Sequence, residues 1–334
     1  LLAHPVIGAR RDAAGLLVAL GGDGGRESVM RIEIDHTTEP EALAEGLRVA
    51  LGEVRLAVGD WLKMRAAALE AALELGAASG RGGGEPKALE EAASFLRWAE
   101  DNHFTFLGHR RYRYAADGTR ALIDGTGLGI LRDRAVRMFD PHPAGGAAMT
   151  AFARSTAPIL LLKSDRPSHV HRGGAMDVIV VKSYGDDGKV VGERRFCGLF
   201  TSSAYHASPR DIPLLRRKVA QIVARAGFDP AGHDGKALLN ILETHPRDEM
   251  FQSDDDTLYA IATGVLRLQE RQHVALFTRR DSAARFLSCL VYAPRDRYDS
   301  DLRRRFMATL ERAYDGAVTS YSVAMGDEST LARV

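Results

Sequence analysis

The sequence has few cysteines and no long apolar segment. Only two of its 334 residues are cysteines, Cys197 and Cys289, which excludes a disulfide scaffold and leaves no metal-ligand spacing. The longest apolar runs, such as residues 158–162 and 178–181, have the length of strands, far below the roughly 18 residues that a membrane span needs. No basic stretch leads into an apolar signal core. We therefore expect a cytoplasmic protein without a membrane partner.

The chain also lacks an excess of either charge. Lys and Arg number 45 and Asp and Glu number 44, so the net charge is +1 and no global field favours nucleic acid. Arginine clusters alternate with tyrosine at residues 110–113, which leaves RNA binding as an alternative. Because only seven of the basic residues are lysine, arginine is the usual cation of this sequence, and we interpret the clusters as solvated faces and ion pairs. No nucleic-acid partner is expected.

The first 78 residues have the pattern of a small sheet and one long helix. Strands are predicted at residues 5–11 and 28–35, the second from the alternation of Met30, Ile32 and Ile34 with charged residues. Thr38 and Glu41 fit a capping box, and a helix is predicted to run from there towards residue 75. Two strands and a helix are half of a ferredoxin-like unit. We expect the other half to precede Leu1, so that the chain is an interior piece of a longer polypeptide.

A glycine-rich segment at residues 77–85 is the clearest predicted linker, and a second domain is predicted at 86–228. A helix starts at Pro86. Strands are predicted at 103–114, 121–131, 159–163, 177–184 and 190–201, with hairpin turns at Asp117-Gly118 and Asp187-Gly188. Ser208 is predicted to cap a closing helix that ends at Gly227. One helix, about five antiparallel strands and a closing helix resemble the PAS and GAF sensor modules.

The last third, residues 232–334, predicts a helical connector and a second ferredoxin-like layer. Helices are predicted at 234–252, 254–272 and 300–313, and strands at 273–278, 285–292 and 317–324. The last five residues have the pattern of a strand that is cut short. The predicted fold class is therefore α+β, built from several modules with antiparallel sheets.

The chain lacks the common catalytic motifs. There is no P-loop, no HExxH and no GxSxG. Residues 125–129 (GTGLG) come nearest to a dinucleotide-binding motif, but the third glycine and a following helix are missing, so a hairpin turn is the better interpretation. A complete dehydrogenase or kinase site is not expected in this chain.

Two local groups of residues leave alternatives open. His169 and His171 could place two imidazoles on one face of a strand, as in some metal sites, although no third ligand lies nearby and a polar loop is preferred. Ser202 or Ser203, His206 and Asp211 contain the residue types of a nucleophilic triad, but sequence proximity does not supply the geometry, and helix capping explains them more simply. We assign no catalytic, cofactor-binding or metal-binding residue.

Several long strings resemble one family. They are FLRWAEDNHFTFLGHRRYRY, GLGILR, LLLKSDRPSHVHRGGAMDVIVVKSY, GKVVGERRFCGLFTSSAY, PRDIPLLRRKV and HDGKALLNILETHPRDEMFQ. These strings resemble the N-terminal regulatory region of the large bacterial NAD-specific glutamate dehydrogenases, and the similarity extends over nearly the whole chain.

This resemblance implies a partial ACT-like domain with a long helix at 1–78, a PAS-like domain at 86–228, and a helical connector with a truncated ACT-like domain at 232–334. It implies a parent enzyme that oxidises L-glutamate to 2-oxoglutarate and ammonia in amino-acid catabolism, with NAD as the cofactor of the parent and none in this segment. The implied partners are a downstream catalytic domain of the same chain, further copies in a homo-oligomer and an amino-acid effector.

The resemblance implies that this segment is noncatalytic and has a regulatory or oligomerisation role. The alternative is a free-standing PAS/ACT-type protein that senses a small molecule. Residues 279–281 (Arg-Arg-Asp) stand where amino-acid-binding ACT domains have an Asp-x-Pro-Gly loop, which argues against an amino acid at that loop. We take five residues as candidates for effector or interface contacts: His171, Arg172, Arg194, Arg279 and Asp281.

Overall fold

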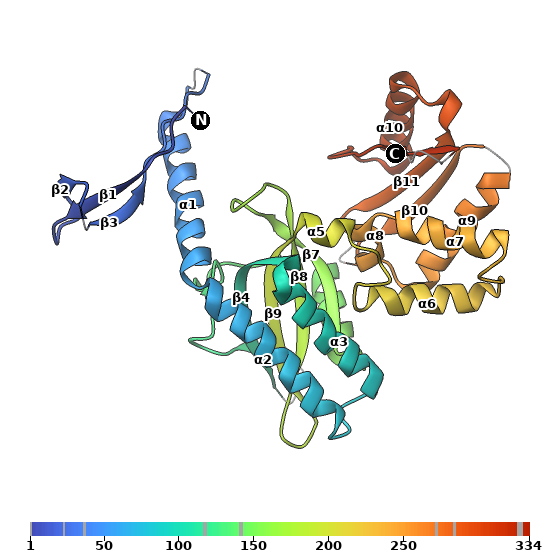
Figure 1. Ribbon diagram of the computed structural model, residues 1–334, viewed down its shortest axis with the longest axis horizontal. Coiled ribbons are helices and arrows are strands. Elements are labelled where there is room, and N and C mark those ends of the chain that lie inside the picture. The colour runs from blue at the N-terminus through green and yellow to red at the C-terminus, as the bar shows by residue number, and fades with distance from the viewer. Residues whose placement is uncertain are drawn as a thin grey trace. The chain divides into compact units, whose positions relative to one another are not determined.

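The fold is described from a computed structural model that covers residues 2–22, 24–35, 38–115, 119–139, 143–270, 273–282, 285–325 and 330–334. The chain divides into two compact units, Leu1–Leu51 and Gly52–Val334. The long helix α1 (Pro40–Gly59) crosses the boundary between them (Figure 1).

The first unit holds a three-stranded antiparallel sheet with the order β2-β1-β3. Its strands are β1 (Val6–Arg11), β2 (Leu17–Leu20) and β3 (Gly25–Ser28). The strand predicted at 28–35 is wrong beyond Ser28, which is the last residue of β3. Arg31 makes only an isolated bridge with Ala3. Met30, Ile32 and Ile34 are exposed in this segment. Alternation alone does not make a strand when no neighbouring surface buries the apolar side chains.

The predicted long helix is two helices. α1 ends at Gly59 and α2 (Trp61–Ser79) follows Asp60, whose backbone leaves the helical conformation. The carboxylate of Asp60 is buried and accepts hydrogen bonds from the backbone N–H of Gly129 at 3.0 Å and from Arg132 Nη2 at 2.6 Å. This contact is made by a residue distant in sequence, so helical periodicity could not predict it.

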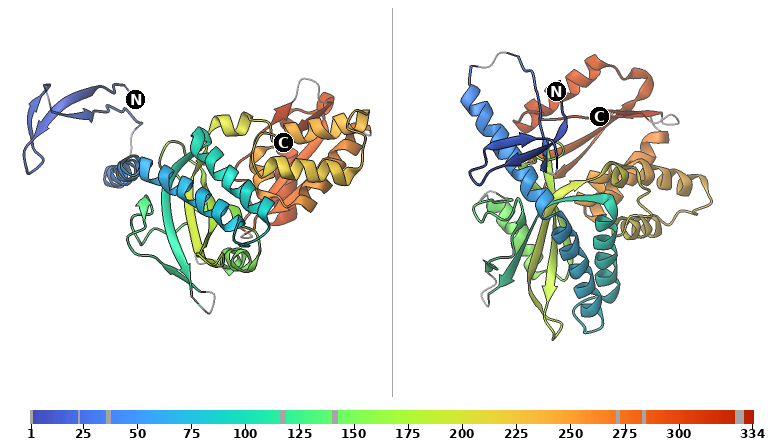
Figure 2. Two further views of the ribbon diagram at one scale, coloured as in Figure 1. Left: turned by 60° about the horizontal axis from the view of Figure 1, so that its bottom comes forward. Right: turned by 60° about the vertical axis from the view of Figure 1, so that its left-hand side comes forward.

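The glycine-rich segment forms a tight turn between α2 and α3 (Pro86–Trp98), where the Gly83 N–H donates to the Ala78 carbonyl oxygen at 3.0 Å. The carboxylate of Glu85 caps α3 by accepting from the N–H of Lys87 and of Ala88. The two helices lie side by side over one face of the large sheet, and the short π-helix η1 (Ala99–His103) leads from α3 into that sheet (Figure 2).

The large sheet is antiparallel throughout and has the order β5-β4-β9-β8-β7, with β6 also paired to β4. Its strands are β4 (Phe104–Tyr114), β5 (Arg120–Leu122), β6 (Leu128–Gly129), β7 (Ile159–Pro167), β8 (Ala175–Tyr184) and β9 (Val190–Phe200). The predicted hairpin at Asp187-Gly188 is confirmed, with Gly188 at φ +76°. The turn predicted at Asp117-Gly118 lies outside the described residues. α4 (Pro143–Arg154) packs on the face opposite to α2.

The helix start predicted at Ser208 is wrong. A short helix, α5 (Ser202–His206), precedes that serine, and α6 (Leu215–Ala226) begins seven residues after it. Leu214 has φ +71°, which a helix cannot include, and Ser208 Oγ donates instead to Glu243 at 2.9 Å. The predicted end at Gly227 is confirmed, with the left-handed φ of +67° that favours glycine.

The last third is a helical cluster followed by a small antiparallel sheet. Its helices are α7 (His233–Thr244), α8 (Arg247–Gln252), α9 (Asp255–Glu270), η2 (Arg295–Arg297) and α10 (Ser300–Tyr314). One helix was predicted at 234–252, but Pro246 disfavours the helical conformation of His245 and divides it.

The small sheet has the order β10-β11-β13-β12 and confirms the predicted α+β class. Its strands are β10 (Ala275–Arg280), β11 (Leu287–Pro294), β12 (Ala324–Met325) and β13 (Leu331–Arg333). The strand predicted at 317–324 is wrong, since only Ala324 of that range is in a strand. The strand predicted in the last five residues is present as β13, which pairs with β11.

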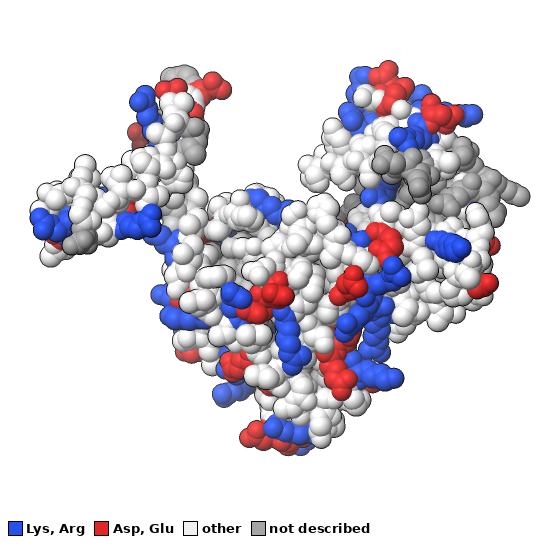
Figure 3. Space-filling view, in the orientation of Figure 1, with Lys and Arg blue, Asp and Glu red and all other residues white. Residues whose placement is uncertain are grey.

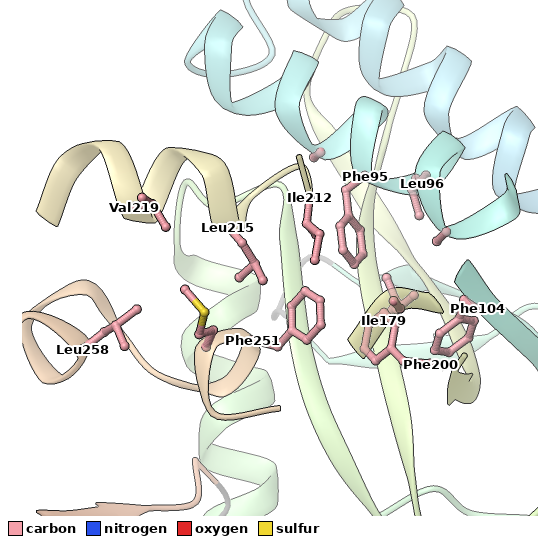
Figure 4. Close-up of a cluster of buried hydrophobic side chains, with 14 of the residues drawn as sticks. Phe95, Leu96, Phe104, Ile179, Phe200, Ile212, Leu215, Val219, Phe251 and Leu258 are labelled. Carbon is pink, nitrogen blue, oxygen red and sulfur yellow. The ribbon is translucent and has the colours of Figure 1, made fainter. Parts of the chain in front are cut away.

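One apolar core joins the large sheet to the helical cluster (Figure 4). Phe95 of α3 lies beside Ile212, and Phe251 of α8 stacks on Phe200 of β9 with ring centroids 4.5 Å apart. The predicted division at residues 78, 86, 228 and 232 stays a prediction. In the described part of the chain, no helix is both long enough and apolar enough to cross a membrane.

Candidate functional site

His171 and Arg172 lie in the connection between β7 and β8. His171 is exposed and has φ +70°. Arg172 donates from Nη2 to the carbonyl oxygen of Phe200 at 2.9 Å and stacks over the ring of Tyr205. His169, the other half of the predicted pair, contacts Glu53 at 3.1 Å instead. Within the described residues, no group of three or more His, Cys, Asp or Glu side chains has the arrangement of a metal site.

Arg279 and Asp281 lie at the end of β10 and both are buried in ion pairs. Arg279 donates to both oxygens of Glu249, at 2.7 and 2.9 Å. Asp281 accepts from Arg285 at 2.7 and 3.1 Å, and Arg285 also pairs with Asp165 of β7. These contacts join the small sheet to α8 and to the large sheet. A structural role accounts for both candidate residues.

Arg194 is also deeply buried. It lies on β9 under α2, with 2% of its side chain exposed, and donates from Nη2 to Glu70 at 2.9 Å and to Glu74 at 2.6 Å. Glu74 also accepts from the backbone N–H of Tyr184 at 2.6 Å. The Nε and Nη1 atoms of Arg194 are buried without a hydrogen-bond partner. The five candidates therefore lie in three separate places and do not form one site.

His109 lies in the same layer as Arg194, with its ring against Phe196 and no hydrogen-bond partner for either nitrogen. Burial, together with the guanidinium groups of Arg194 and Arg111, lowers the pKa of His109 to about 3. The imidazole is therefore neutral at physiological pH. In the strand predicted at 103–114, His109 alternates with aromatic residues, a pattern typical of a surface imidazole. The cover that α2 provides buries it instead.

A pocket of about 440 Å³ opens at the end of the large sheet, next to this layer. We call it the Arg111 pocket. Strands β4, β8 and β9 supply most of its lining: Arg111, Tyr112, Arg113, Tyr114, Ile123, Ser183, Val190, Val191 and Gly192. Sequence reasoning missed this pocket as a site, although the cluster of arginines at 110–113 was a signal for it.

A second buried polar cluster lies between the large sheet and α8. Lys163 Nζ lies 2.7 Å from Asp177 and 3.1 Å from Asp248, and the hydroxyl of Tyr205 donates to Asp248 at 3.0 Å. Burial raises the pKa of Asp177 to about 6, although the lysine opposes that shift. A lysine shared by two carboxylates has the arrangement of a structural ion pair.

The triad residue types do not assemble into a catalytic site. His206 Nδ1 lies 2.7 Å from the carbonyl oxygen of Ser202, one turn earlier in α5. No hydrogen bond joins His206 to Asp211 in the described part of the chain. Without an acidic partner to orient it, the imidazole lacks the arrangement that activates a serine.

Residues 125–129 do not have the arrangement of a dinucleotide-binding turn. Residues 125–129 lead into β6, which pairs antiparallel with β4, and no helix N-terminus follows to face a pyrophosphate. Gly129 has φ +57°, and a Cβ there would lie 2.1 Å from the Leu107 carbonyl oxygen. The close approach of two strands therefore explains this glycine, and no hydride-transfer step is derived for these residues.

The arginine clusters mostly make contacts within the protein. Arg110 donates to the carbonyl oxygens of Leu131 and Asp133, and Arg195 pairs with Glu193. On the face drawn in Figure 3, positive and negative side chains are interspersed over the described surface. This distribution favours the ion-pair interpretation over RNA binding.

Two segments match glutamate dehydrogenase families. Residues 212–271 match the family described as glutamate dehydrogenase, helical motif 1, and residues 275–334 match the glutamate dehydrogenase ACT2 domain. The first corresponds to α6 through α9 and the second to the small sheet with α10. The match supports the ACT-like interpretation of the small sheet.

Relatives match nearly the whole chain. It is 38% identical to the NAD-specific glutamate dehydrogenase of Pseudomonas aeruginosa, over 98% of this chain and 21% of that protein. It is 38% identical to that of Halomonas elongata, over 92% and 20%, and 30% identical to that of Mycobacterium tuberculosis, over 90% and 18%. The chain thus spans about a fifth of the length of these relatives. The resemblance stated from its motifs is confirmed: this chain is similar, over almost all of its length, to part of the NAD-specific glutamate dehydrogenases.

Proposed function

We propose that this chain is a noncatalytic regulatory and assembly segment of an NAD-dependent glutamate dehydrogenase. The observation that carries the proposal is the 38% identity over 98% of the chain to one fifth of such an enzyme. In the proposed parent polypeptide, L-glutamate, NAD⁺ and water become 2-oxoglutarate, ammonia and NADH. The hydride transfer belongs to a catalytic domain elsewhere on the same polypeptide, which acts in the cytoplasm.

The noncatalytic part of the proposal is supported by how the polar clusters are used. Arg279, Asp281 and Lys163 each form an ion pair with a partner that is itself largely buried. Glutamate-dependent NADH formation is the decisive measurement. We expect turnover by the complete polypeptide and none by this chain alone. Turnover by this chain alone contradicts the noncatalytic assignment.

The assembly part is supported by the apolar surface of the first unit. About half or more of the surface of Leu16, Leu17 and Leu20 is exposed. Leu43 and Leu47 form an exposed stripe on α1. We expect this surface to be covered in the homo-oligomer of the complete polypeptide. In the complete polypeptide, Leu47→Glu should lower the molar mass of the oligomer measured by light scattering. Glu45→Gln, on the same helix, should leave that molar mass unchanged.

The alternative is a free-standing protein that senses a small molecule, and the Arg111 pocket is the observation that favours it. Expression analysis separates the two proposals. A transcript that encodes this chain without a nucleotide-binding domain supports the sensor, whereas one continuous coding sequence supports the enzyme segment.

A further inference from the structure

We propose that the Arg111 pocket binds a small dicarboxylate anion, with Arg111 and Arg113 as the carboxylate-binding groups. The inference concerns ligand binding by this chain and does not depend on glutamate oxidation. It rests on cations without counter-ions, on buried donors without acceptors and on the apolar lining of the pocket.

The two arginines that line the pocket lack carboxylate partners. Within the described residues, neither Arg111 nor Arg113 makes an ion pair, and the Nε atom of Arg111 is buried without a hydrogen-bond partner. Neighbouring arginines do have partners. Arg110 of β4 donates to three backbone carbonyl groups, and Arg195 of β9 pairs with Glu193. The pocket thus brings together two arginines that form no ion pair within the described residues.

The nearest carboxylates are already committed to another cation. Glu70 and Glu74 both accept from Arg194, and Glu74 accepts from the Tyr184 N–H as well. Glu70 lies close enough to Arg111 for the two charges to interact, although its hydrogen bond is made with Arg194. Arg113 forms no ion pair with a carboxylate among the described residues. A partly buried positive charge attracts an anion more strongly than an exposed one, because solvent screens it less.

Further donors at the same place lack acceptors. Ser183 lines the pocket with a buried hydroxyl that has no hydrogen-bond partner, and Arg194 has two such nitrogens. Buried polar groups in folded proteins are nearly always satisfied, by the protein itself or by a bound molecule or ion. An oxyanion at this position would accept from Arg111 and from Ser183.

The strand register places these donors in adjacent rows. Arg113, Gly192 and Ser183 face one another across β4, β9 and β8, and Arg111 is paired with Arg194 in the next row. A Cβ at Gly192 would lie 2.1 Å from the Tyr112 carbonyl oxygen, so only glycine fits there. No side chain therefore separates Arg113 from Ser183 at the central strand.

The remaining lining selects an organic anion over an inorganic one. Ile123, Val190 and Val191 contribute apolar side chains, and Val191 is 45% exposed. A volume of about 440 Å³ lies in the range of small-molecule sites, which combine an apolar lining with a few polar groups. The methylene groups of a dicarboxylate would cover the valines while its two carboxylates meet Arg111 and Arg113.

Isothermal titration calorimetry of the full chain with succinate, without NAD or glutamate, tests the proposal. We expect saturable binding with a Kd below about 1 mM that weakens as salt is added. Succinamide, which is neutral and of similar shape, and inorganic phosphate should bind at least tenfold more weakly. No saturable binding of succinate, or equal binding of phosphate as an adventitious ion only, overturns the proposal.

Variants locate the binding. Arg111→Gln and Ser183→Ala should each weaken succinate binding, Arg111→Gln by at least about tenfold, because a hydrogen bond from a charged donor is worth roughly that factor. Arg154 is an exposed arginine of α4 that does not line the Arg111 pocket, so Arg154→Gln is the matched control and should bind succinate as the unaltered chain does. An unchanged Kd in Arg111→Gln overturns the assignment.

Chemical modification of the unaltered chain tests the proposal even if a variant does not fold. Phenylglyoxal modifies accessible guanidinium groups, and peptide mass spectrometry measures the extent at each arginine. Succinate should protect Arg111 and Arg113 in the unaltered chain and leave Arg154 unprotected. Equal modification with and without succinate contradicts the proposal. Because neither measurement involves glutamate oxidation, this inference and the proposed function can fail separately.

Discussion

Arg279 of β10 donates two hydrogen bonds to the carboxylate of Glu249 in α8, at 2.7 and 2.9 Å. Only 8% of the arginine side chain and 13% of the glutamate side chain are exposed. The pair joins the segment that matches helical motif 1 to the segment that matches the ACT2 domain. Two segments named separately in the family are thus connected by a buried ion pair.

Removing one partner of this pair should be costly. Arg279→Ala leaves Glu249 buried without its counter-ion, and we expect a loss of about 3–5 kcal/mol in the free energy of unfolding. Arg280→Ala is the matched control, because Arg280 is adjacent and exposed, and it should change stability by less than about 0.5 kcal/mol. Urea melts of both variants provide the measurement. Equal effects show that the pair does not join the two segments.

The core between the large sheet and the helical cluster predicts a strong effect at Phe95. This side chain is fully buried and packs edge-on against Phe200 and Phe251. Phe95→Ala should cost about 3–5 kcal/mol through lost contacts and the cavity left behind. Leu73→Ala, on the exposed side of α2, should cost far less. Denaturant melts that show a loss below 1 kcal/mol for Phe95→Ala contradict this packing.

Asp60 should matter more than its position between two helices suggests. Asp60→Ala removes the acceptor for the Gly129 N–H and for Arg132, and we expect a loss of about 2–3 kcal/mol. Asp124→Ala removes an exposed ion pair with Arg134 and should cost about 0–1 kcal/mol. Thermal melts of the two variants compare a buried carboxylate with an exposed one on the same side of the sheet.

The buried histidines predict acid sensitivity. Burial lowers the pKa of His109 to about 3 and that of His245 to about 4, below the value of about 6.5 expected in the unfolded chain. The unfolded state therefore binds more protons between these values, and stability falls as pH falls from about 6.5 towards 4. At pH 4.5 each histidine should cost roughly 2 kcal/mol relative to pH 7.

The variants His109→Gln and His245→Gln test this pH dependence. Each should flatten the fall in unfolding free energy between pH 6.5 and 4.5, whatever its stability at pH 7. His233→Gln, which replaces an exposed histidine at the start of α7, is the control and should keep the slope. Denaturant melts at several pH values give the slopes, and parallel profiles for all variants contradict the assignment to the buried imidazoles.

Asp177 should have the opposite effect on the pH dependence of stability. Its pKa of about 6 is raised above the unfolded value, so its contribution is favourable at low pH and is lost as pH rises through 6.

Local sequence determined most elements of the large sheet and the helices. Asp187-Gly188 specified a hairpin because glycine accepts a positive φ, and Gly227 ended α6 for the same reason. The resemblance to the glutamate dehydrogenases follows from several long strings of the sequence, which are similar to the family whatever the fold. The α+β class followed from the alternation of apolar residues in strands and their spacing in helices.

Only the tertiary structure decided which of those local signals were used. Residues 29–35 alternate as a strand would, yet they make only an isolated bridge at Arg31, and Met30, Ile32 and Ile34 stay exposed. Ser208 has the side chain of a helix cap, yet α6 begins only after Leu214, whose φ of +71° is not helical. The serine donates to Glu243 instead. His109 has the context of a surface residue and is buried because α2 covers it. The Arg111 pocket likewise depends on the register of the strands and on Glu70 and Glu74 of α2, which accept from Arg194. Packing decides which distant charges meet, so the charge balance of this pocket cannot be obtained from spacing along the chain.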